Sequence, residues 1–538
     1  MKKTVRAGGF AISSILATAL AGPVQAQEVD QTNRIIDEGM NRSEVMVLAH
    51  ELMDGIGARL SNSPQMRRAE QWAVDRLNGW NLTNVHREGF EFGRGWEILS
   101  SSAQMVSPRP RALTVIPVTW TPPTDGTVRA EIVMAPMSEP EHFEAYRGQL
   151  AGKIVLISLP GEGSEPDTAP FRRFTDAEIA ERNSYHQPDF DPGAIDDVTR
   201  RDEFTRLVDA FLTSEGAVAI IRMSPRDGNL VQGQAYEHEV GSTLRLPMLE
   251  MTTEDYRRLA RLARTGPAPV LEINSNVRFD DSDSLAYNII ADIPGTDRNA
   301  GYVMAGAHFD SWAAGDGAVD NGAGSVVVME AARIIASLGI RPRRTIRFAL
   351  WAAEEQGLLG SRAYTERHIA TRPAPRTGNN FTDRFGWFTT YPVTLLPGQA
   401  DLKVYFNMDN GSGRFRGIYA EGNVAAVPML QQWIQPFASL GAAHIVAGPT
   451  RGTDHEFFSA SGIPAFQFIQ DPLDYRSRLH HTNIDTVDHI QAEDLRQAAV
   501  VMAGMLVTAA NADETLPRMP VPQQPVVIDP FAYEYPDE

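Results

Sequence analysis

The chain has 538 residues and a formal net charge of −19 at pH 7, with 43% hydrophobic residues, 22% charged residues and no cysteine. This balance is typical of a large globular protein, and the acidity argues against nucleic acid or an anionic membrane as a partner, because both need a basic face. Without cysteine the chain has no disulfide, thiolate metal site or cysteine nucleophile.

The first 26 residues have the pattern of a secretory signal peptide. Lys2, Lys3 and Arg6 form a basic segment, an apolar stretch follows to about Leu20, and small residues end at Ala26. The apolar stretch is short for a bilayer-spanning helix, which needs about 20 residues. We therefore predict cleavage after Ala26, a periplasmic or secreted location, and no membrane partner after cleavage.

The segment that follows begins with helices. Val45, Leu48, Leu52 and Ile56 recur at helical spacing, and residues 67–80 have a second such pattern. Residues 94–125 are rich in Pro, Thr and Ser and are expected to turn toward strands. We assign this stretch, residues 27–124, to the same domain as residues 271–515.

A separate, smaller α/β domain is predicted over residues 125–270. Four short apolar runs separated by turn residues predict its strands: VRAEIVMA, GKIVLISL, GAVAIIRM and LPMLEM. Residues 202–216 and 253–266 have helical patterns. The polar, proline-rich residues 162–200 predict a surface excursion.

From about residue 285 strands and helices alternate. The runs YVMAGA, TIRFALW, KVYFNM and AFQFIQ each precede a helical pattern. This rhythm predicts an α/β fold in which helices sandwich a mostly parallel, mixed sheet. A loop of residues 370–400 interrupts the alternation, and residues 516–538 form a tail without periodicity.

Histidines and carboxylates follow each of the four strands, where function gathers in such sheets. They are His308, Asp310 and Asp320 after the first, Glu354 and Glu355 after the second, Asp409 after the third, and His480 and His481 after the fourth. So many acids in one cleft would repel each other without a cation. Imidazoles and carboxylates suit zinc, and a shared carboxylate bridges two ions.

The adjacent pair Glu354 and Glu355 points to hydrolysis. Neighbouring side chains beyond a strand end point in different directions, so one can bind metal while the other stays free as a general base for metal-bound water. Asp485 is open to two interpretations, orienting a ligand or capping a turn. Arg414 and Arg416 also have two interpretations: they could bind a peptide carboxylate, or they could be ordinary surface residues. The surface interpretation is favoured.

The segments AHFDSW, GAVDNGAG, WAAEEQGLLGSRAY, MDNGSG, GTDHEFF and HHTNIDT together resemble metallopeptidase family twenty-eight, the di-zinc exopeptidases. RPRRTIRFALWAAEEQGLLGS with the later HHT is most similar to the carboxypeptidase Q branch. The resemblance implies the zinc-exopeptidase fold, phosphorylase/hydrolase-like, with residues 125–270 as an inserted protease-associated domain.

The resemblance also implies roles for the site residues. His308 and Asp409 would bind one zinc ion, Glu355 and His481 the other, with Asp320 as the bridge, Glu354 as the base and Asp310 as the partner of the His308 ring. The peptide bond between Asp320 and Asn321 is expected to be cis. Where many members have tyrosine, this chain has His480, which would steady the oxyanion by a hydrogen bond. That substitution leaves open which histidine binds metal, and HTNIDT favours His481.

The expected function is that of an exported exopeptidase with two zinc ions per chain. It would act as an aminopeptidase or dipeptidase on short peptides, using a metal-bound hydroxide and Glu354. The alternatives are a single-zinc relative such as a glutaminyl cyclase and an inactive peptide-binding relative. The sequence leaves a homodimer open.

Overall fold

The structure is a computed structural model, and it describes residues 23–163, 169–183, 194–241, 244–373 and 386–524. The predicted signal peptide, apart from its last residues, lies outside these ranges, as do the end of the predicted tail and part of the long loop. Among the helices in the described ranges, none combines the length and the apolar character needed to span a bilayer.

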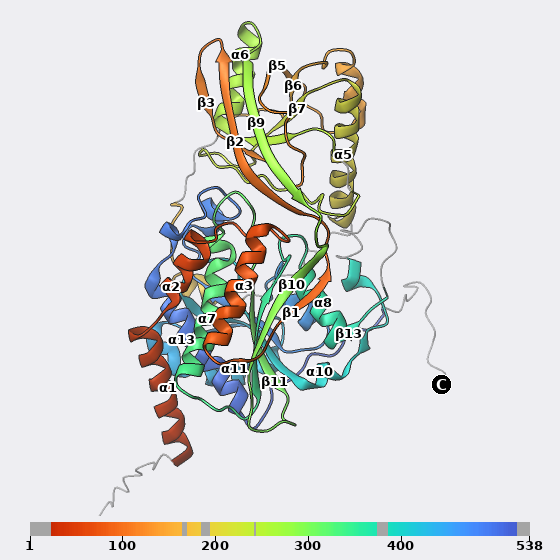
Figure 1. Cartoon of the computed structure of the whole chain (residues 1–538). Coiled ribbons are helices and arrows are strands. Elements are labelled where there is room, and N and C mark those ends of the chain that lie inside the picture. The colour runs from red at the N-terminus through yellow and green to blue at the C-terminus, as the bar shows by residue number, and fades with distance from the viewer. Residues whose placement is uncertain (1–22, 164–168, 184–193, 242–243, 374–385, 525–538) are drawn as a thin grey trace, which may run out of the picture.

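The larger unit is built on an eight-stranded sheet (Figure 1). In spatial order the strands are β1 (Thr83–Glu91), β10 (Leu285–Ile293), β12 (Thr345–Trp351), β11 (Tyr302–His308), β15 (Leu402–Asn407), β18 (Ala465–Gln470), β16 (Phe415–Tyr419) and β17 (His444–Val446). The central strands β12, β11, β15 and β18 are parallel, and β10 and β16 flank them in the antiparallel sense. The predicted mostly parallel, mixed sheet is confirmed.

Helices cover both faces of this sheet. They are α1 (Pro23–Asn41), α2 (Val45–Ala49), α3 (Pro64–Gly79), α7 (Ala323–Ser337), α8 (Leu359–His368), α10 (Pro397–Asp401), α11 (Val427–Ile434), α12 (His455–Ser459) and α13 (Ala492–Asn511). On one face α7 and α13 pack on β11, where Val303 and Ala305 enter the core. On the other face Met304 packs with Trp351 and Phe458, near α8 and α12. This burial on both faces explains why the strand sequences are continuous apolar runs.

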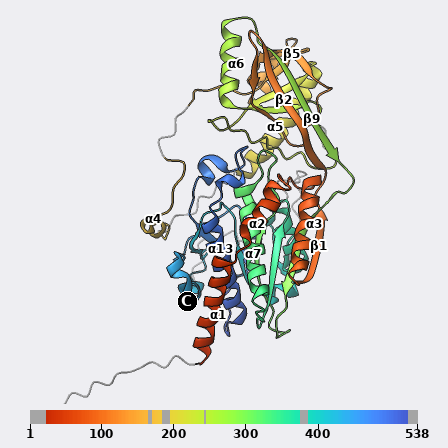
Figure 2. The same cartoon turned by 60° about the vertical axis from the view of Figure 1, so that its left-hand side comes forward.

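The smaller unit has a second eight-stranded sheet, and Figures 1 and 2 show it stacked on the larger unit. Its strands, in spatial order, are β3 (Arg111–Leu113), β2 (Gly95–Ser107), β9 (Val270–Asp280), β5 (Val128–Met134), β6 (Ile154–Leu156), β7 (Ala219–Met223), β8 (Met248–Met251) and β4 (Val115–Pro117). Helices α5 (Ala194–Ser214) and α6 (Thr253–Thr265) pack against it. Two apolar clusters, one around Ile221 and Leu249 and one around Ile220 and Leu212, form its core.

The smaller unit is wider than the predicted range of 125–270. Strand β2 begins at Gly95 and β9 runs to Asp280, so residues 95–117 belong to this unit and not to the larger one. Strands were expected in residues 94–125, but the polar sequence GWEILSSSAQMVS does not indicate to which unit its strand belongs, and the pairing with β9 decides this. Part of the predicted excursion is also helical, since α4 (Asp176–Glu181) and the start of α5 lie within 162–200.

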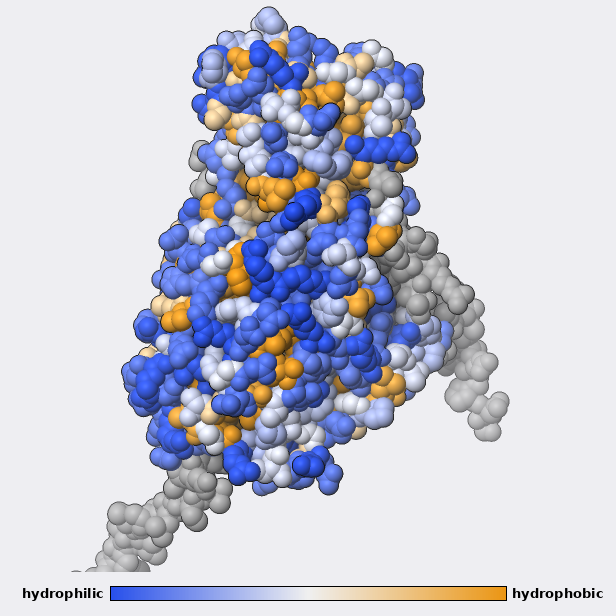
Figure 3. All heavy atoms as spheres, in the orientation of Figure 1, coloured by the Kyte–Doolittle hydropathy of each residue, from blue (hydrophilic) through white to orange (hydrophobic). Residues whose placement is uncertain are grey.

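A two-stranded ribbon joins the units. β1 continues into β2 through residues 92–94, and β9 continues into β10 through residues 281–284. The connectors are bonded to each other: the backbone N–H groups of Phe92 and Gly93 donate to the Ser284 carbonyl at 3.0 and 2.9 Å, and Arg94 contacts the Asp281 carboxylate at 2.6 Å. The face of the molecule in Figure 3 is mostly hydrophilic, with apolar residues in small groups.

The remaining short elements lie in the larger unit. They are the ribbon β13 (Ala370–Thr371) and β14 (Thr394–Leu395), the π-type turns η1 (His50–Asp54), η3 (Ala318–Gly322) and η7 (Tyr475–Leu479), and the 3₁₀ turns η4 (Gly386–Thr389), η5 (Val424–Ala426), η6 (Gln435–Leu440) and η8 (Val487–His489). A further 3₁₀ turn, η2 (Pro140–Tyr146), belongs to the smaller unit. Turns η3 and η7 matter most here, because they carry the chain to the candidate site.

Candidate metal centre

Imidazoles and carboxylates gather at the carboxyl ends of the four parallel strands. His308 ends β11, Glu354 and Glu355 follow β12, and Asp409 follows β15. After β18 the chain passes through η7 to His481. Because these strands are neighbours in the sheet, residues more than 170 positions apart are delivered to one edge (481 − 308 = 173).

Asp320 lies between two histidines. Its Oδ1 is 3.3 Å from His308 Nε2, and its Oδ2 is 3.0 Å from His481 Nε2. His308 Nε2 is also 3.5 Å from Asp409 Oδ1, and His481 Nε2 is 3.0 Å from Glu355 Oε2. The five side chains thus form two sets of donor atoms that share one carboxylate.

His480 lies beside His481, with the two rings stacked at a centroid separation of 3.6 Å. Its Nε2 is 3.8 Å from Asp320 Oδ2, farther than that of His481, and it has no comparably short contact to Glu355 among the contacts of the described residues. The donor atoms of Asp320, His480 and His481 all lie within 4.8 Å of one another. The geometry therefore favours His481 over His480 as the candidate metal-binding histidine, and His480 lies next to it.

Asp310 supports the site differently from the way the resemblance implied. The contact with His308 Nδ1 at 3.0 Å is made by the Asp310 backbone carbonyl, whereas its carboxylate is 3.7 Å away. The Asp310 carboxylate accepts the backbone N–H groups of Glu354 and Glu355 at 3.1 and 3.3 Å, and the Ser61 hydroxyl at 3.0 Å. Its main contacts therefore fix the turn that carries the two glutamates.

Asp485 holds the backbone at Asp320. Its carboxylate is buried and accepts the N–H groups of Val319 at 2.7 Å and Asp320 at 3.1 Å. The peptide bond from Asp320 to Asn321 is cis, as expected. Of the two interpretations of Asp485, orienting a ligand is the one these contacts favour.

Sequence reasoning missed three residues around the ligands. Tyr475 donates its hydroxyl to Asp320 Oδ2 at 3.2 Å, and Trp312 donates its indole N–H to Glu355 Oε2 at 2.7 Å. The buried guanidinium of Arg59 donates to the carbonyls of Phe309, Asp316 and Gly317. Trp312 could have been found, because it ends the segment AHFDSW. Arg59 and Tyr475 resemble ordinary polar positions in the sequence.

Residues 288–506 match the sequence profile described as Peptidase family M28. The chain carries an M28 peptidase domain. It is 26% identical over 471 residues to carboxypeptidase Q of Mus musculus, covering 87% of this chain and 86% of the relative. A solved structure of a Peptidase M28 precursor from Shewanella amazonensis matches with a TM-score of 0.63 and 24% identity, covering 92% and 99% of the two chains.

A zinc aminopeptidase from Bacillus subtilis, BSAP, has a related fold. Its structure matches with a TM-score of 0.54 and 19% identity, and the match covers 87% of this chain and 95% of that one. Both structural matches extend well beyond residues 288–506. The fold similarity therefore includes the smaller unit as well as the M28 domain.

The cluster of candidate ligands in the M28 domain is buried, and its charges influence one another strongly. Burial raises the pKa of Glu355 to about 7, although His481 opposes the shift. Burial likewise raises the pKa of Glu354 well above its ordinary value, with Asp409 adding to the effect. Burial acts to lower the pKa of His308, but the carboxylates of Asp409 and Glu354 outweigh this effect and raise the pKa. Positive charge is therefore stabilised at this position.

A pocket of about 300 Å³ opens above the cluster. Its lining includes Tyr236, Asp320, Glu354, Glu355, Asp409, Asn410, Arg451, Tyr475, Arg476, His480 and His481. Tyr236 belongs to the smaller unit, while the other residues come from the M28 domain. The pocket is at the small end of ligand sites, with carboxylates at its base and two arginines among its walls.

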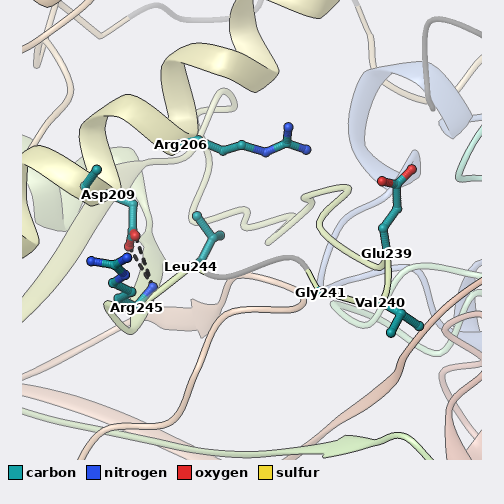
Figure 4. A pocket seen from close by; sticks show the side chains of 8 residues that line it. Arg206, Asp209, Glu239, Val240, Gly241, Leu244 and Arg245 are labelled. Carbon is teal, nitrogen blue, oxygen red and sulfur yellow. Dashed lines mark hydrogen bonds between the residues drawn. The ribbon is translucent and has the colours of Figure 1, made fainter. Parts of the chain in front are cut away.

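The smaller unit has another pocket, which Figure 4 shows beside α5. Arg206, Asp209 and Glu239 are among its lining residues, and Asp209 accepts the backbone N–H groups of Arg245 and Leu246, each at 3.0 Å. These bonds tie the residues after 243 to α5. They give Asp209 a structural role, and the M28 ligand cluster is elsewhere.

Arg414 and Arg416, for which the sequence left two interpretations, have structural roles. Arg414 pairs with Asp494 at 3.1 Å, and Arg416 pairs with Asp471 at 3.0 Å. The surface interpretation was the favoured one, and their carboxylate partners in the same chain agree with it. Trp387 of the long loop packs in a small apolar cluster with Phe457.

Proposed function

We propose that the protein is an exported exopeptidase that uses two zinc ions held by His308, Asp320, Glu355, Asp409 and His481. The M28 domain makes it a peptidase, and the shared position of Asp320 between His308 and His481 is the observation that carries the two-ion assignment. Export rests on the signal-peptide pattern alone.

The donor atoms fit zinc. Imidazole nitrogens and carboxylate oxygens are its ligands in catalytic sites when thiolates are lacking. Glu355 Oε1 is buried and has no hydrogen-bond partner among the described residues, and such an atom needs a cation or a donor. When bound, the ions would lower the pKa of a water molecule and polarise a peptide carbonyl.

Glu354 is the proposed general base. It lines the pocket beside Glu355, and Asp310 fixes its backbone. A carboxylate whose pKa is raised by burial is suited to accept a proton from water and then deliver it to the amine that leaves. His480, also in the lining, would donate a hydrogen bond to the oxyanion. Burial lowers its pKa to about 4, so it is neutral at pH 7 and keeps one N–H donor.

The relatives differ in the peptide end that their names indicate. Carboxypeptidase Q is named for the carboxyl end and BSAP for the amino end. The small pocket suits short peptides, so both terminal groups of a dipeptide would lie close to its walls. A dipeptidase or aminopeptidase activity is therefore the form of exopeptidase that we propose.

The test is a panel of dipeptides and peptides blocked at either end, assayed with and without a chelator. We expect hydrolysis of free short peptides, its loss on chelation and its return with zinc. Glu354→Gln should lower kcat by about 10²–10⁴-fold, because a positioned general base contributes that much, while metal content stays at two ions per chain. Hydrolysis by Glu354→Gln at the parental rate would refute the assignment.

A further inference from the structure

A segment of the smaller unit, residues 231–236, lies against the metal centre of the larger unit. The backbone N–H of Val231 donates to Asn483 Oδ1 at 2.9 Å, and Asn483 N–H donates to the Val231 carbonyl at 3.0 Å. Gln232 Nε2 donates to the His480 carbonyl at 3.2 Å. This segment therefore runs beside the stretch that carries both site histidines.

The same segment is fixed to its own unit. The Thr119 N–H donates to the Gly233 carbonyl at 2.9 Å, the Ala235 N–H donates to Thr119 Oγ1 at 2.8 Å, and the Arg222 guanidinium donates to the Gln234 carbonyl at 2.7 Å. Gly233 has a φ of +67°, and a Cβ there would be 2.9 Å from Ile116 Cγ2. The backbone at Gln234 is thus set by the smaller sheet.

The side chain of Gln234 contacts the ring of His481. In the structure the amide nitrogen of Gln234, Nε2, is the atom next to His481 Nδ1. The other ring nitrogen, His481 Nε2, faces Asp320 and Glu355 at 3.0 Å each. An imidazole that gives its Nε2 lone pair to a metal ion carries its hydrogen on Nδ1 and needs an acceptor there. When the amide plane of Gln234 turns by about 180°, its oxygen takes the place of Nε2 beside His481 Nδ1 and supplies this acceptor.

We propose that Gln234 is a positioning residue for His481, and that through it the smaller unit becomes part of the metal centre. By accepting the Nδ1 hydrogen, Gln234 fixes the tautomer and the orientation of the ring. The inference rests on the proposed function, since it assigns zinc to the His481 donor set. Partners of this kind change metal affinity by 10–100-fold when they are removed from other metalloproteins.

The test measures zinc affinity of the full-length protein by competition with a chromophoric chelator. Gln234→Met keeps the length of the side chain and removes the acceptor, and Gln234→Ala is a second variant should the first not fold. We expect one of the two zinc equivalents to bind about 10–100-fold more weakly and the other to bind as in the parent, because His481 contacts only one donor set.

Three controls separate positioning from general damage. Gln234→Glu retains an acceptor and should restore affinity. Gln232→Met removes a side chain from the same segment that reaches only a backbone carbonyl, so its zinc affinity should match the parent. In a His481→Ala background, Gln234→Met should have no further effect on zinc binding.

The outcomes distinguish this inference from the proposed function. If the parent fails to bind two zinc equivalents or to hydrolyse peptides, the proposed function is wrong. If the parent binds two equivalents and both Gln234→Met and Gln234→Ala bind them with parental affinity, only the role of Gln234 is overturned.

Discussion

At the scale of single residues, the pair His480 and His481 divides two tasks between adjacent positions. His481 faces Asp320 and Glu355, while His480 stacks on it and lines the pocket. Their pKa values move in opposite directions. Burial lowers the pKa of His480 to about 4. Burial also acts to lower the pKa of His481, but the neighbouring Glu355 and Asp320 carboxylates outweigh this effect and raise the pKa of His481 to about 10. The same residue type is thus adapted to two roles by its contacts.

This division predicts the effect of replacing His480. His480→Phe keeps an aromatic ring but has no hydrogen-bond donor. We therefore expect kcat to fall by about 10²-fold, which is the lower end of the effect of removing one oxyanion donor. His480→Tyr supplies a hydroxyl donor and should retain most of the activity. Steady-state kinetics on a dipeptide, with zinc content measured for each variant, would test this. Equal kcat for the Phe and Tyr variants would contradict a donor role.

The parental pH profile offers a check on the same assignment. Because burial places the pKa of His480 near 4, its neutral form predominates from about pH 5 upward, and the His480 contribution should not titrate between pH 5 and 8. The ratio of parental kcat to His480→Phe kcat should therefore be constant over that range. A ratio that changes with a midpoint near 6.5 would indicate an imidazole with an ordinary pKa.

At the scale of elements, the turn between β11 and α7 is the least regular part of the site and depends on Arg59. The Arg59 side chain spans it by donating to Phe309 O at 2.8 Å, Asp316 O at 2.9 Å and Gly317 O at 2.8 Å. Gly317 has a φ of +58°, and a Cβ at this position would approach the Ser311 side chain to 2.2 Å. One guanidinium, distant in the sequence, therefore bonds to the Phe309 and Asp316 carbonyls and adds a second donor to the Gly317 carbonyl, which also accepts the backbone N–H of Gly322.

Replacement of Arg59 should destabilise the protein and loosen the metal site. Arg59→Met removes the guanidinium donor from the Phe309 and Asp316 carbonyls, which costs about 2–4 kcal/mol in unfolding free energy. Arg59→Lys should recover only part of this free energy, because lysine lacks the planar fork of donors. Urea unfolding measures the first effect and zinc titration the second. The control is Arg68→Met, which replaces an exposed arginine on α3. Its unfolding free energy should equal that of the parent. Unchanged stability of Arg59→Met would show that these bonds contribute little.

The elements that sequence could predict are those with an unambiguous apolar pattern. Strands β11, β12, β15 and β18 are buried on both sides, so their sequences are continuous apolar runs. Of the candidate metal ligands, His308, Glu355 and Asp409 lie at or just after strand ends, whereas Asp320 and His481 follow after longer turns. Strand β2 lies in the stretch that was expected to turn toward strands, but it was assigned to the larger unit, because its partly exposed, polar sequence does not indicate that it pairs with β9. Arg59, Gln234 and Tyr475 were missed for another reason: they act across long sequence separations, and no local pattern marks a side chain whose partner is far away.

At the scale of the whole molecule, the charge distribution constrains the substrate. The chain has a net charge of −19, and the base of the pocket is acidic, yet Arg451 and Arg476 are in its lining. Arg476 donates to Asn410 Oδ1 at 3.1 Å, and Asn410 Nδ2 is buried without a partner among the described residues. The lining thus offers hydrogen-bond donors to an anionic group as well as carboxylates.

We expect these arginines to interact with the free carboxylate of a short peptide. Arg451→Ala and Arg476→Ala should each raise KM for a free dipeptide by about tenfold, equivalent to roughly 1.4 kcal/mol, and should change KM for the corresponding dipeptide amide little. Arg414→Ala, whose guanidinium pairs with Asp494, is the matched control. If both substrates are affected alike, the arginines do not recognise the carboxylate.

The ribbon that joins the two units leaves and re-enters the larger sheet at a single place. Because Phe92 and Gly93 bond to Ser284, the ends of the smaller unit are already in contact with each other before its first strand begins. Replacing the whole smaller unit at this junction would therefore leave the strand order of the larger sheet unchanged. It would nevertheless change the candidate site, because Gln234 contacts His481 and Tyr236 lines the pocket.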